Sequence, residues 1–263
     1  MMDKILTVQN LNKTYSNFWG RRKKQVLKDL SFDLYKSEKL AIVAKNGAGK
    51  TTLAKIISGY IGYESGEIKY NYEFTWSPYE EILLEFQESH NIPFHFVGEL
   101  INDYKVRGKE RLISKDYESY LYEKLNIKRF KGRRFSKLSG GEKQILKLYL
   151  SLIVKTKILI LDEFTSALDF ENKKFVREIL MEYLENFDVT LILISHDAGE
   201  IRRIADRIIV LRDGKVFNEL KDIKSKFKND DEIEEVLKEN IEDIAATNLN
   251  KSNTFLNFKR KNK

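Results

Sequence analysis

The chain has 263 residues, of which 42% are hydrophobic and 33% are charged, and it contains no cysteine. This composition suits one large globular domain, or one domain with an inserted lobe, and it excludes disulfides and thiolate metal sites. The formal charge of +7 is open to three interpretations: a nucleic-acid partner, an anionic membrane face, or simply a Lys-rich solvated surface. No RNA-binding signature or zinc-finger spacing supports the first of these. We therefore expect no nucleic-acid partner.

Neither a membrane span nor a leader segment is expected. The longest apolar runs, such as residues 189–194, are strand-sized, far short of the roughly 18–20 residues that a spanning helix needs. Residues 1–6 lack the basic end and apolar run of a signal peptide. These features predict a chain that stays in the cytosol.

Strand patterns open the chain and recur along it. Residues 5–8, 11–15 and 26–35 have the pattern of an antiparallel β-lobe. Continuous apolar segments, which are typical of buried strands in a parallel sheet, follow at 40–43, 158–161 and 189–194. A closing hairpin is expected around Asp213-Gly214.

Helical patterns alternate with these strands, at residues 51–57, 97–125 and 175–184. Such alternation predicts an α/β fold with a parallel-sheet core. The long stretch at 97–125 lies between the first two apolar strands, so we expect an inserted helical lobe at about 90–140. The whole domain should span residues 1–220.

The last segment, residues 221–263, differs in character. Apolar residues between Ile233 and Ile244 fall at helical spacing, and the chain ends in the basic stretch Lys259–Lys263. We expect a terminal helix followed by a disordered basic tail.

A phosphate-binding loop is predicted where the strand at 40–43 ends. The P-loop pattern is Gly, four residues and Gly-Lys-Ser/Thr between a strand and a helix. The chain matches it except at the first glycine, where Ala44 stands. The predicted nucleotide-binding residues of the loop are Ala44, Lys45, Asn46, Gly47, Ala48, Gly49, Lys50, Thr51 and Thr52.

The chemistry of this loop explains its residue types. Successive N–H groups and a helix N-terminus attract phosphate oxygens, and Gly47 and Gly49 allow a close approach of the backbone. Lys50 would place a charge on the terminal phosphates, and the Thr51 hydroxyl can bind Mg²⁺.

Two acids end the apolar strand at 158–161. A carboxylate at the carboxyl end of a strand beside a phosphate loop can hold Mg²⁺, a role that suits Asp162. Glu163, one residue on, can activate the attacking water. Alone, such a pair is also common in a solvated turn, so it gains weight only from the phosphate loop upstream.

Four further motifs carry a specific family resemblance. Ser139-Gly140-Gly141-Glu142 looks like the signature of ATP-binding-cassette (ABC) ATPases, and Ser166-Ala167-Leu168-Asp169 resembles their D-loop. Ile194-Ser195-His196-Asp197 is similar to the switch-histidine segment, and Phe86-Gln87-Glu88-Ser89 lies where the Q-loop should be. With Tyr15 as the adenine-stacking aromatic, the motifs occur in the family order. Phe164 departs from it, since Pro or Ala is usual there.

This resemblance implies an ATP hydrolase of the P-loop NTPase fold with an inserted helical signature lobe. Glu163, His196 and Lys50 would be catalytic. Mg²⁺ would be bound by Thr51, Gln87 and Asp162, and Tyr15 would stack on adenine.

The resemblance also implies partners. Residues 139–142 and Asp169 would face the ATP of a second cassette, identical or paralogous, in a head-to-tail dimer. A single cassette without membrane helices would need separate transmembrane permease subunits, and a solute-binding protein is a further candidate partner. Its place would be the cytoplasmic face of the cell membrane, as a peripheral subunit.

The transported substrate is less well defined. The aromatic-basic loop at residues 18–24 and the segment 194–197 resemble the oligopeptide, dipeptide and nickel importer branch, although its His-Pro-Tyr-Thr stretch is absent. Import of a peptide or another small solute is the favoured function. A peptide or drug exporter and a soluble ATPase of the iron–sulfur assembly type are the alternatives.

Overall fold

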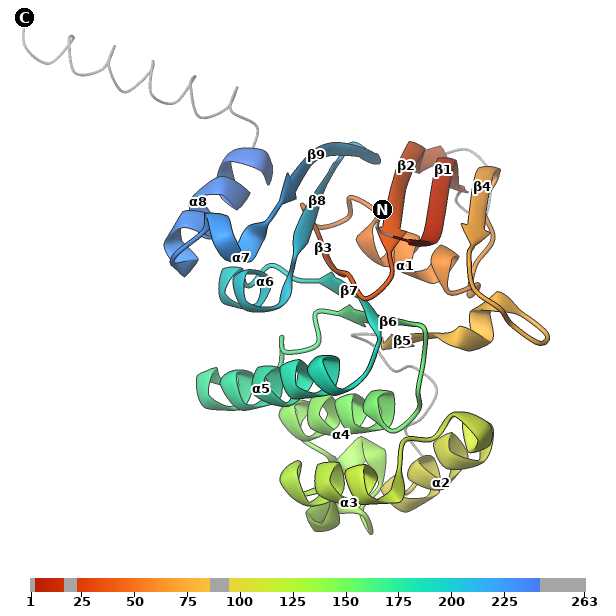
Figure 1. The fold of residues 1–263 in the computed structure, drawn as a ribbon, viewed down its shortest axis with the longest axis vertical. Helices are drawn as coiled ribbons and strands as arrows, with labels where there is room; N and C mark the ends of the chain where they lie inside the picture. The colour runs from red at the N-terminus through yellow and green to blue at the C-terminus, as the bar shows by residue number, and fades with distance from the viewer. Residues whose placement is uncertain (1–2, 17–22, 86–94, 242–263) are drawn as a thin grey trace, which may run out of the picture.

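In the computed structural model, the described residues are 3–16, 23–85 and 95–241. They form two β-sheets with helices packed around them (Figure 1). The predictions at Gln87, at residues 18–22 and at the basic tail 259–263 lie outside the described residues. Among the described helices, none has the length and apolar composition to cross a membrane.

The first sheet is antiparallel, as predicted for the N-terminal lobe. Its strand order is β2-β1-β4, with β1 at Lys4–Ser16, β2 at Lys23–Tyr35 and β4 at Ser65–Tyr70. The sequence predicts two short strands where β1 is continuous. A register shift between Val8 and Leu11 explains the break in the pattern, because Asn10 takes a left-handed φ of 49° there and forms a bulge.

The second sheet has six strands in the order β5-β6-β7-β3-β8-β9. Their bounds are β5 Ile82–Glu85, β6 Ile158–Asp162, β7 Thr190–Ile194, β3 Lys39–Ala44, β8 Arg207–Arg212 and β9 Lys215–Lys221. The first five are parallel, and β9 joins β8 as the predicted antiparallel hairpin. The sequence analysis missed β5.

Successive side chains along a strand of this sheet point to opposite faces and pack in different parts of the core. Leu40 and Ile42 of β3 face the antiparallel sheet together with α1 (Lys50–Ile57). Ala41 and Val43 face the opposite way, toward α6 (Ala198–Ile204), α7 (Ile223–Lys226) and α8 (Asp230–Ile241). Both faces are therefore covered, which explains why these strands are apolar throughout.

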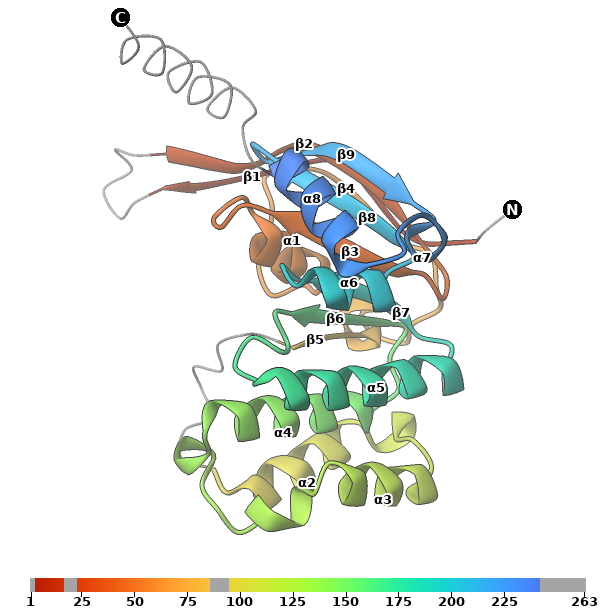
Figure 2. The same ribbon diagram turned by 90° about the vertical axis from the view of Figure 1, so that its left-hand side faces the viewer.

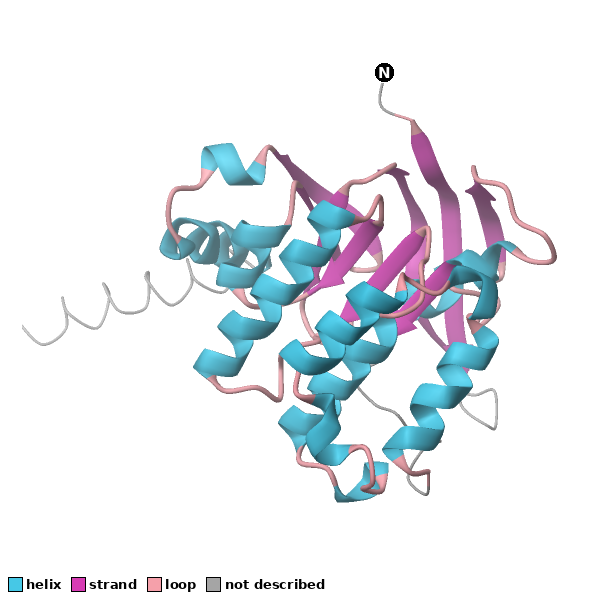
Figure 3. Cartoon of the chain, turned by 60° about the horizontal axis from the view of Figure 1, so that its bottom comes forward, coloured by secondary structure: helices cyan, strands magenta, loops and turns pink. Residues whose placement is uncertain are grey.

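Helices α4 (Gly140–Leu152) and α5 (Phe170–Asn186) cover the β6 and β7 side of the sheet. Figure 2 shows the layers in order, from the strands through α5 and α4 to α2 and α3, and these helices lie in front of the strands in Figure 3. The large apolar core between them includes Leu159, Leu191 and Tyr183.

The helical lobe is broken into short pieces. Its helices are α2 (Val97–Arg107) and α3 (Lys115–Lys124), with 3₁₀ turns at Lys109–Arg111, Ile127–Phe130 and Phe135–Lys137; a further turn, Pro78–Glu81, precedes β5. The sequence predicts one helical stretch over 97–125. The helix ends at Gly108 because Leu112 is extended and bridges to Val154.

Candidate nucleotide site

Three strands of the central sheet end together at one edge. Ile42 of β3 and Asp162 of β6 both pair with Ile194 of β7. The segments that follow these strands are the phosphate loop, Glu163 and His196, so they leave the sheet at the same level. This edge is where ligands bind in open parallel sheets.

Lys50 links two of these segments. Its side chain is only 6% exposed, and its Nζ donates to the Ala44 carbonyl at 2.8 Å and lies 2.8 Å from His196 Nε2. An ammonium group can only donate, so His196 accepts through Nε2 and its ring is neutral. Burial lowers the pKa of Lys50, while Glu163 and Asp162 oppose that shift. Burial and then the Lys50 charge lower the pKa of His196.

Thr51 and Asp162 form the second contact across the site. The Thr51 hydroxyl donates to Asp162 Oδ2 at 2.6 Å, and Asp162 is 3% exposed. Burial raises the pKa of Asp162, and the Thr51 hydrogen bond opposes it. A hydroxyl and a buried carboxylate are the hard oxygen donors that Mg²⁺ prefers, so these two residues fit the ion.

The Glu163 backbone is held in an uncommon conformation. Its φ is +52°, in the left-handed region, which residues with a Cβ seldom adopt. Three hydrogen bonds hold it: its N–H donates to Ile194 O at 2.9 Å, and its carbonyl accepts from the Ser166 N–H at 3.0 Å and from Gln144 Nε2 at 3.1 Å. Its Oε1 lies 3.8 Å from His196 Nε2.

The phosphate loop borders a cavity of about 380 Å³ that is also lined by β2 and the β8–β9 turn. Gly47 and Gly49 have φ of +75° and +104°, and a Cβ on Gly49 would lie 2.9 Å from a Leu27 methyl. Ala44 ends β3 and is not among the described residues with positive φ. The backbone conformation at Ala44 therefore does not require a glycine.

The signature segment lies against the D-loop of its own chain. Ser139 caps α4: its Oγ accepts from the Glu142 N–H at 3.2 Å, and its own N–H donates to Glu142 Oε2 at 2.9 Å. A Cβ on Gly140 would lie 3.3 Å from the Ala167 Cβ. These interactions define a second group of predicted residues, separate from the cluster around Lys50.

The remaining predicted residues lie near these groups. Tyr15 is 44% exposed and pairs across β1 and β2 with Lys24, which lines the loop cavity. Asp169 caps α5 by accepting from the Asn172 N–H at 2.9 Å. Phe164, the departure from the family pattern, is 1% exposed and packs in the core under α4 and α5.

The sequence model of the family described as ABC transporter matches residues 27–166, just over half of the chain. The chain belongs to the ABC transporter family. It is an ATP-binding subunit whose ATP hydrolysis is coupled to transport. Among its relatives, this cassette resembles the energy-coupling factor transporter ATP-binding protein EcfA1 of Ligilactobacillus salivarius (strain UCC118). The two are 32% identical over 239 residues, covering 86% of this chain and 81% of the relative.

Solved structures agree with the fold of the cassette. An ATP-binding subunit of an ABC transporter superposes with a TM-score of 0.72 at 21% identity, covering 89% of this chain and 99% of that one. The cbiO1 protein of Clostridium perfringens, part of the ABC transporter complex cbiONQ, gives 0.66 at 25% identity, with 85% and 90% covered. The predicted α/β fold of a P-loop NTPase is confirmed.

Sequence reasoning missed several buried polar residues of the cassette. Gln144 binds the Glu163 carbonyl, as described above. Glu85, at the end of β5, is 6% exposed and lies 3.5 Å from Lys147 Nζ of α4. Burial raises the pKa of Glu85 to about 7. The available signal was an acid closing the apolar run Ile82-Leu83-Leu84. A third buried polar residue, the acid Glu200, lies in α6.

Proposed function

We propose that this cassette powers an energy-coupling factor transporter that imports a small solute. Its support is the assembled site, in which Lys50, Thr51, Asp162, Glu163 and His196 come together from three strand ends. The names of the relatives add the transporter type, since EcfA1 proteins are energy-coupling factor transporter ATP-binding proteins.

The proposed roles follow from the chemistry of each group. The N–H groups of residues 44–52 and the Lys50 ammonium bind the ATP phosphates, for which Lys50 exchanges its present acceptors, Ala44 O and His196 Nε2. Glu163 takes the proton of the attacking water. Once freed from Lys50, the neutral His196 ring takes the tautomer with its proton on Nε2, donates from that nitrogen to the terminal phosphate and orients that water.

Mg²⁺ would be held by Thr51 and Asp162, and Gln87, which lies outside the described residues, is the third proposed ligand. When bound, the ion neutralises charge on the phosphate oxygens. Tyr15 is exposed enough to receive the adenine ring, a contact worth about 1 kcal/mol.

A second cassette completes the proposed site. A Cβ added to Gly140 or Gly141 would lie 3.3 Å from Ala167 or Leu168 of the same chain, and none of the described contacts joins these glycines to Lys50. A helix N-terminus such as that of α4 attracts phosphate. We therefore propose a head-to-tail dimer in which Ser139, Gly140, Gly141 and Glu142 of one chain, with Asp169 nearby, face the ATP of the other.

Transmembrane permease subunits are the other proposed partners, and they would place the cassette at the cytoplasmic face of the cell membrane. The cbiO1 protein is likewise part of a transporter complex. The oligopeptide, dipeptide and nickel branch stays a prediction, because the relatives above carry energy-coupling factor names instead. A solute-binding protein also stays a prediction.

The test is a co-purification from the native cell. A tagged Glu163→Gln chain, which should bind ATP but hydrolyse it slowly, is extracted from membranes in mild detergent with MgATP. Lys50→Ala, which weakens ATP binding, is the control. Polytopic membrane proteins enriched with Glu163→Gln over the control support the proposal, and an extracellular solute-binding protein among them would favour the peptide branch. Recovery of soluble partners alone, with no membrane association, would overturn it.

A further inference from the structure

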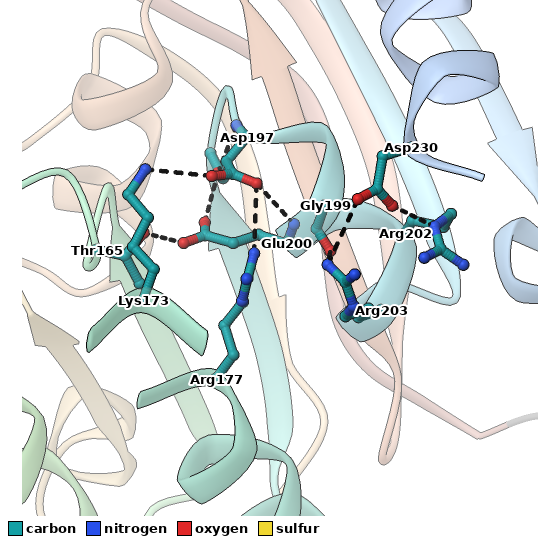
Figure 4. Close-up of polar contacts among 10 residues, drawn as sticks. Thr165, Lys173, Arg177, Asp197, Gly199, Glu200, Arg202, Arg203 and Asp230 are labelled. Carbon is teal, nitrogen blue, oxygen red and sulfur yellow. Dashed lines mark hydrogen bonds and ion pairs between the residues drawn. The ribbon is translucent and has the colours of Figure 1, made fainter. Parts of the chain in front are cut away.

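A buried carboxylate lies behind the two segments that carry Glu163 and His196. Glu200, on α6, is 1% exposed. Both of its oxygens accept hydrogen bonds from hydroxyl groups: Oε2 from Ser195 Oγ at 2.6 Å, and Oε1 from Thr165 Oγ1. Figure 4 shows Glu200 between Thr165 on one side and Asp197 on the other.

The positions of these hydroxyls relate Glu200 to the proposed site. Thr165 follows Glu163 by two residues, and Ser195 immediately precedes His196. One rigid carboxylate thus spans the loop after β6 and the loop after β7. Both hydroxyl residues are 3% exposed, so water does not replace the carboxylate as their partner.

The residue after His196 is held as well. Asp197 caps α6 by accepting from the Glu200 N–H at 3.0 Å, and its own N–H donates to Ser195 Oγ at 3.0 Å. Its carboxylate lies 3.2 Å from Lys173 Nζ and 3.5 Å from Arg177 Nη1, both on α5 (Figure 4). His196 is therefore bracketed by two residues whose side chains are anchored.

We propose that Glu200 is a positioning residue for ATP hydrolysis, which holds the Glu163 loop and the His196 loop at a fixed separation through the Thr165 and Ser195 hydroxyls. The inference rests on the proposed roles of Glu163 and His196. Its physical basis is that a buried, fully paired polar network fixes geometry more tightly than apolar packing does, and a misplacement of about 1 Å can cost a hundredfold in rate.

A purely structural role makes a different prediction. A buried carboxylate that only stabilises the fold would, when replaced, lower the melting temperature without changing the rate of the folded molecules. A positioning role predicts that kcat falls while ATP binding and KM stay near their original values, because Glu200 contacts neither the phosphate loop nor Tyr15 in the described contacts.

The experiment uses the full chain, assayed at a temperature at which each variant is folded. Glu200→Ala should lower kcat by about 10- to 100-fold, with the KM for ATP within about twofold. Thr165→Val combined with Ser195→Ala removes the same two hydrogen bonds and should give a similar loss, and adding Glu200→Ala to this pair should cost little more. Thr165→Ser and Ser195→Thr keep the hydroxyls and should retain most of the rate.

The matched control is Glu38→Ala. Glu38 is a half-buried acid, with a 10% exposed side chain paired to Arg207, but it precedes β3 and lies at the opposite edge of the sheet. The Glu38→Ala variant should be less stable than the wild type but should keep its kcat. If Glu200→Ala fails to fold, the two hydroxyl variants carry the test.

The outcomes separate the two proposals. If the Glu163→Gln variant hydrolysed ATP at the wild-type rate, the proposed role of Glu163, on which this inference rests, would be refuted. An inactive Glu163→Gln together with an unchanged kcat in Glu200→Ala, or in the hydroxyl pair, would overturn the positioning role alone. An equal loss of kcat in Glu38→Ala would also overturn it, because the effect would then reflect general stability.

Discussion

At the scale of single residues, backbone conformation decides which positions of the site tolerate a side chain. Gly49 combines a φ of +104° with crowding by Val26 and Leu27 of β2, whereas Ala44 is not among the described residues with positive φ. Glu163 keeps its positive φ because three hydrogen bonds hold its backbone. The strain at Glu163 therefore coincides with the residue proposed to activate water, as strained residues often do at functional sites.

Gly49→Ala should be strongly destabilising. The alanine must keep a disfavoured φ, and its Cβ would lie 3.1 Å from Val26 O and 2.9 Å from a Leu27 methyl. We therefore expect a loss of about 2–4 kcal/mol in the free energy of unfolding. Urea denaturation measures it. Gly62→Ala, which meets no atom within 4 Å, is the control and should stay within about 0.5 kcal/mol of the wild type. Equal effects at the two positions would contradict the argument.

Glu142→Gln should change stability in a pH-dependent way. The Ser139 N–H, aided by Arg133, holds the pKa of Glu142 below its ordinary value of 4.5. A lowered pKa in the folded state means that the ionised group stabilises the fold above pH 4.5, and this contribution is lost as the pH falls through the folded value. In urea denaturation, the free energy of unfolding of the wild type should exceed that of the variant at pH 7, and the two values should approach each other near pH 3. A difference that stays constant over this range would show that ionisation of Glu142 is irrelevant.

At the scale of elements, helix ends serve both the fold and the proposed chemistry. Helices α4, α5 and α6 each begin with a side chain that caps the helix, and the capping residues are Ser139, Asp169 and Asp197. These caps lie in the signature, in the D-loop and beside His196. Each of these loops, to which we assign a function by proposal, is thus fixed to the start of a helix by its capping residue.

Ser139→Ala should affect both stability and activity. Removing the cap costs about 1 kcal/mol, and the proposed contact with the partner's ATP is lost as well, so hydrolysis should fall at least tenfold. Ser114 caps α3 in the same way, accepting from the Tyr117 N–H at 3.3 Å. Ser114→Ala should lose similar stability but keep its ATPase rate. Parallel measurements of unfolding and hydrolysis decide this, and equal rates in the two variants would contradict the role of Ser139.

At the scale of the whole molecule, the site is divided into two groups that the fold holds apart. The phosphate loop and its partners gather at the edge of the six-stranded sheet, while the signature starts α4 beside the helical lobe (Figure 1). One chain therefore has two surfaces that we propose to bind ATP phosphates. A head-to-tail pair of chains would use both surfaces, with ATP between them.

The Glu163→Gln chain should dimerise with MgATP. Slow hydrolysis keeps the terminal phosphate in place, so light scattering during size-exclusion chromatography should show twice the 31.0 kDa mass of the chain. Lys50→Ala should remain monomeric under the same conditions, and MgADP should not support the dimer. A monomer with MgATP at micromolar concentrations would contradict the proposed arrangement.

The local features of this protein could be predicted from short stretches of contiguous residues. The phosphate loop, the acids Asp162 and Glu163, and the apolar strands were predictable, because contiguous residues form each motif and each strand is buried on both faces. The α/β fold and the family resemblance followed from the order of these motifs.

Contacts between residues far apart in the chain became evident only in the folded molecule. Glu200 lies 35 residues from Thr165, and Glu85 lies far along the chain from Lys147, so no local pattern pairs them. The short strand β5 also went unpredicted, since its four residues form a strand only by pairing with β6. Buried polar contacts depend on the desolvation and geometry that folding creates. For this reason the pairing of these buried polar residues could not be predicted from the sequence.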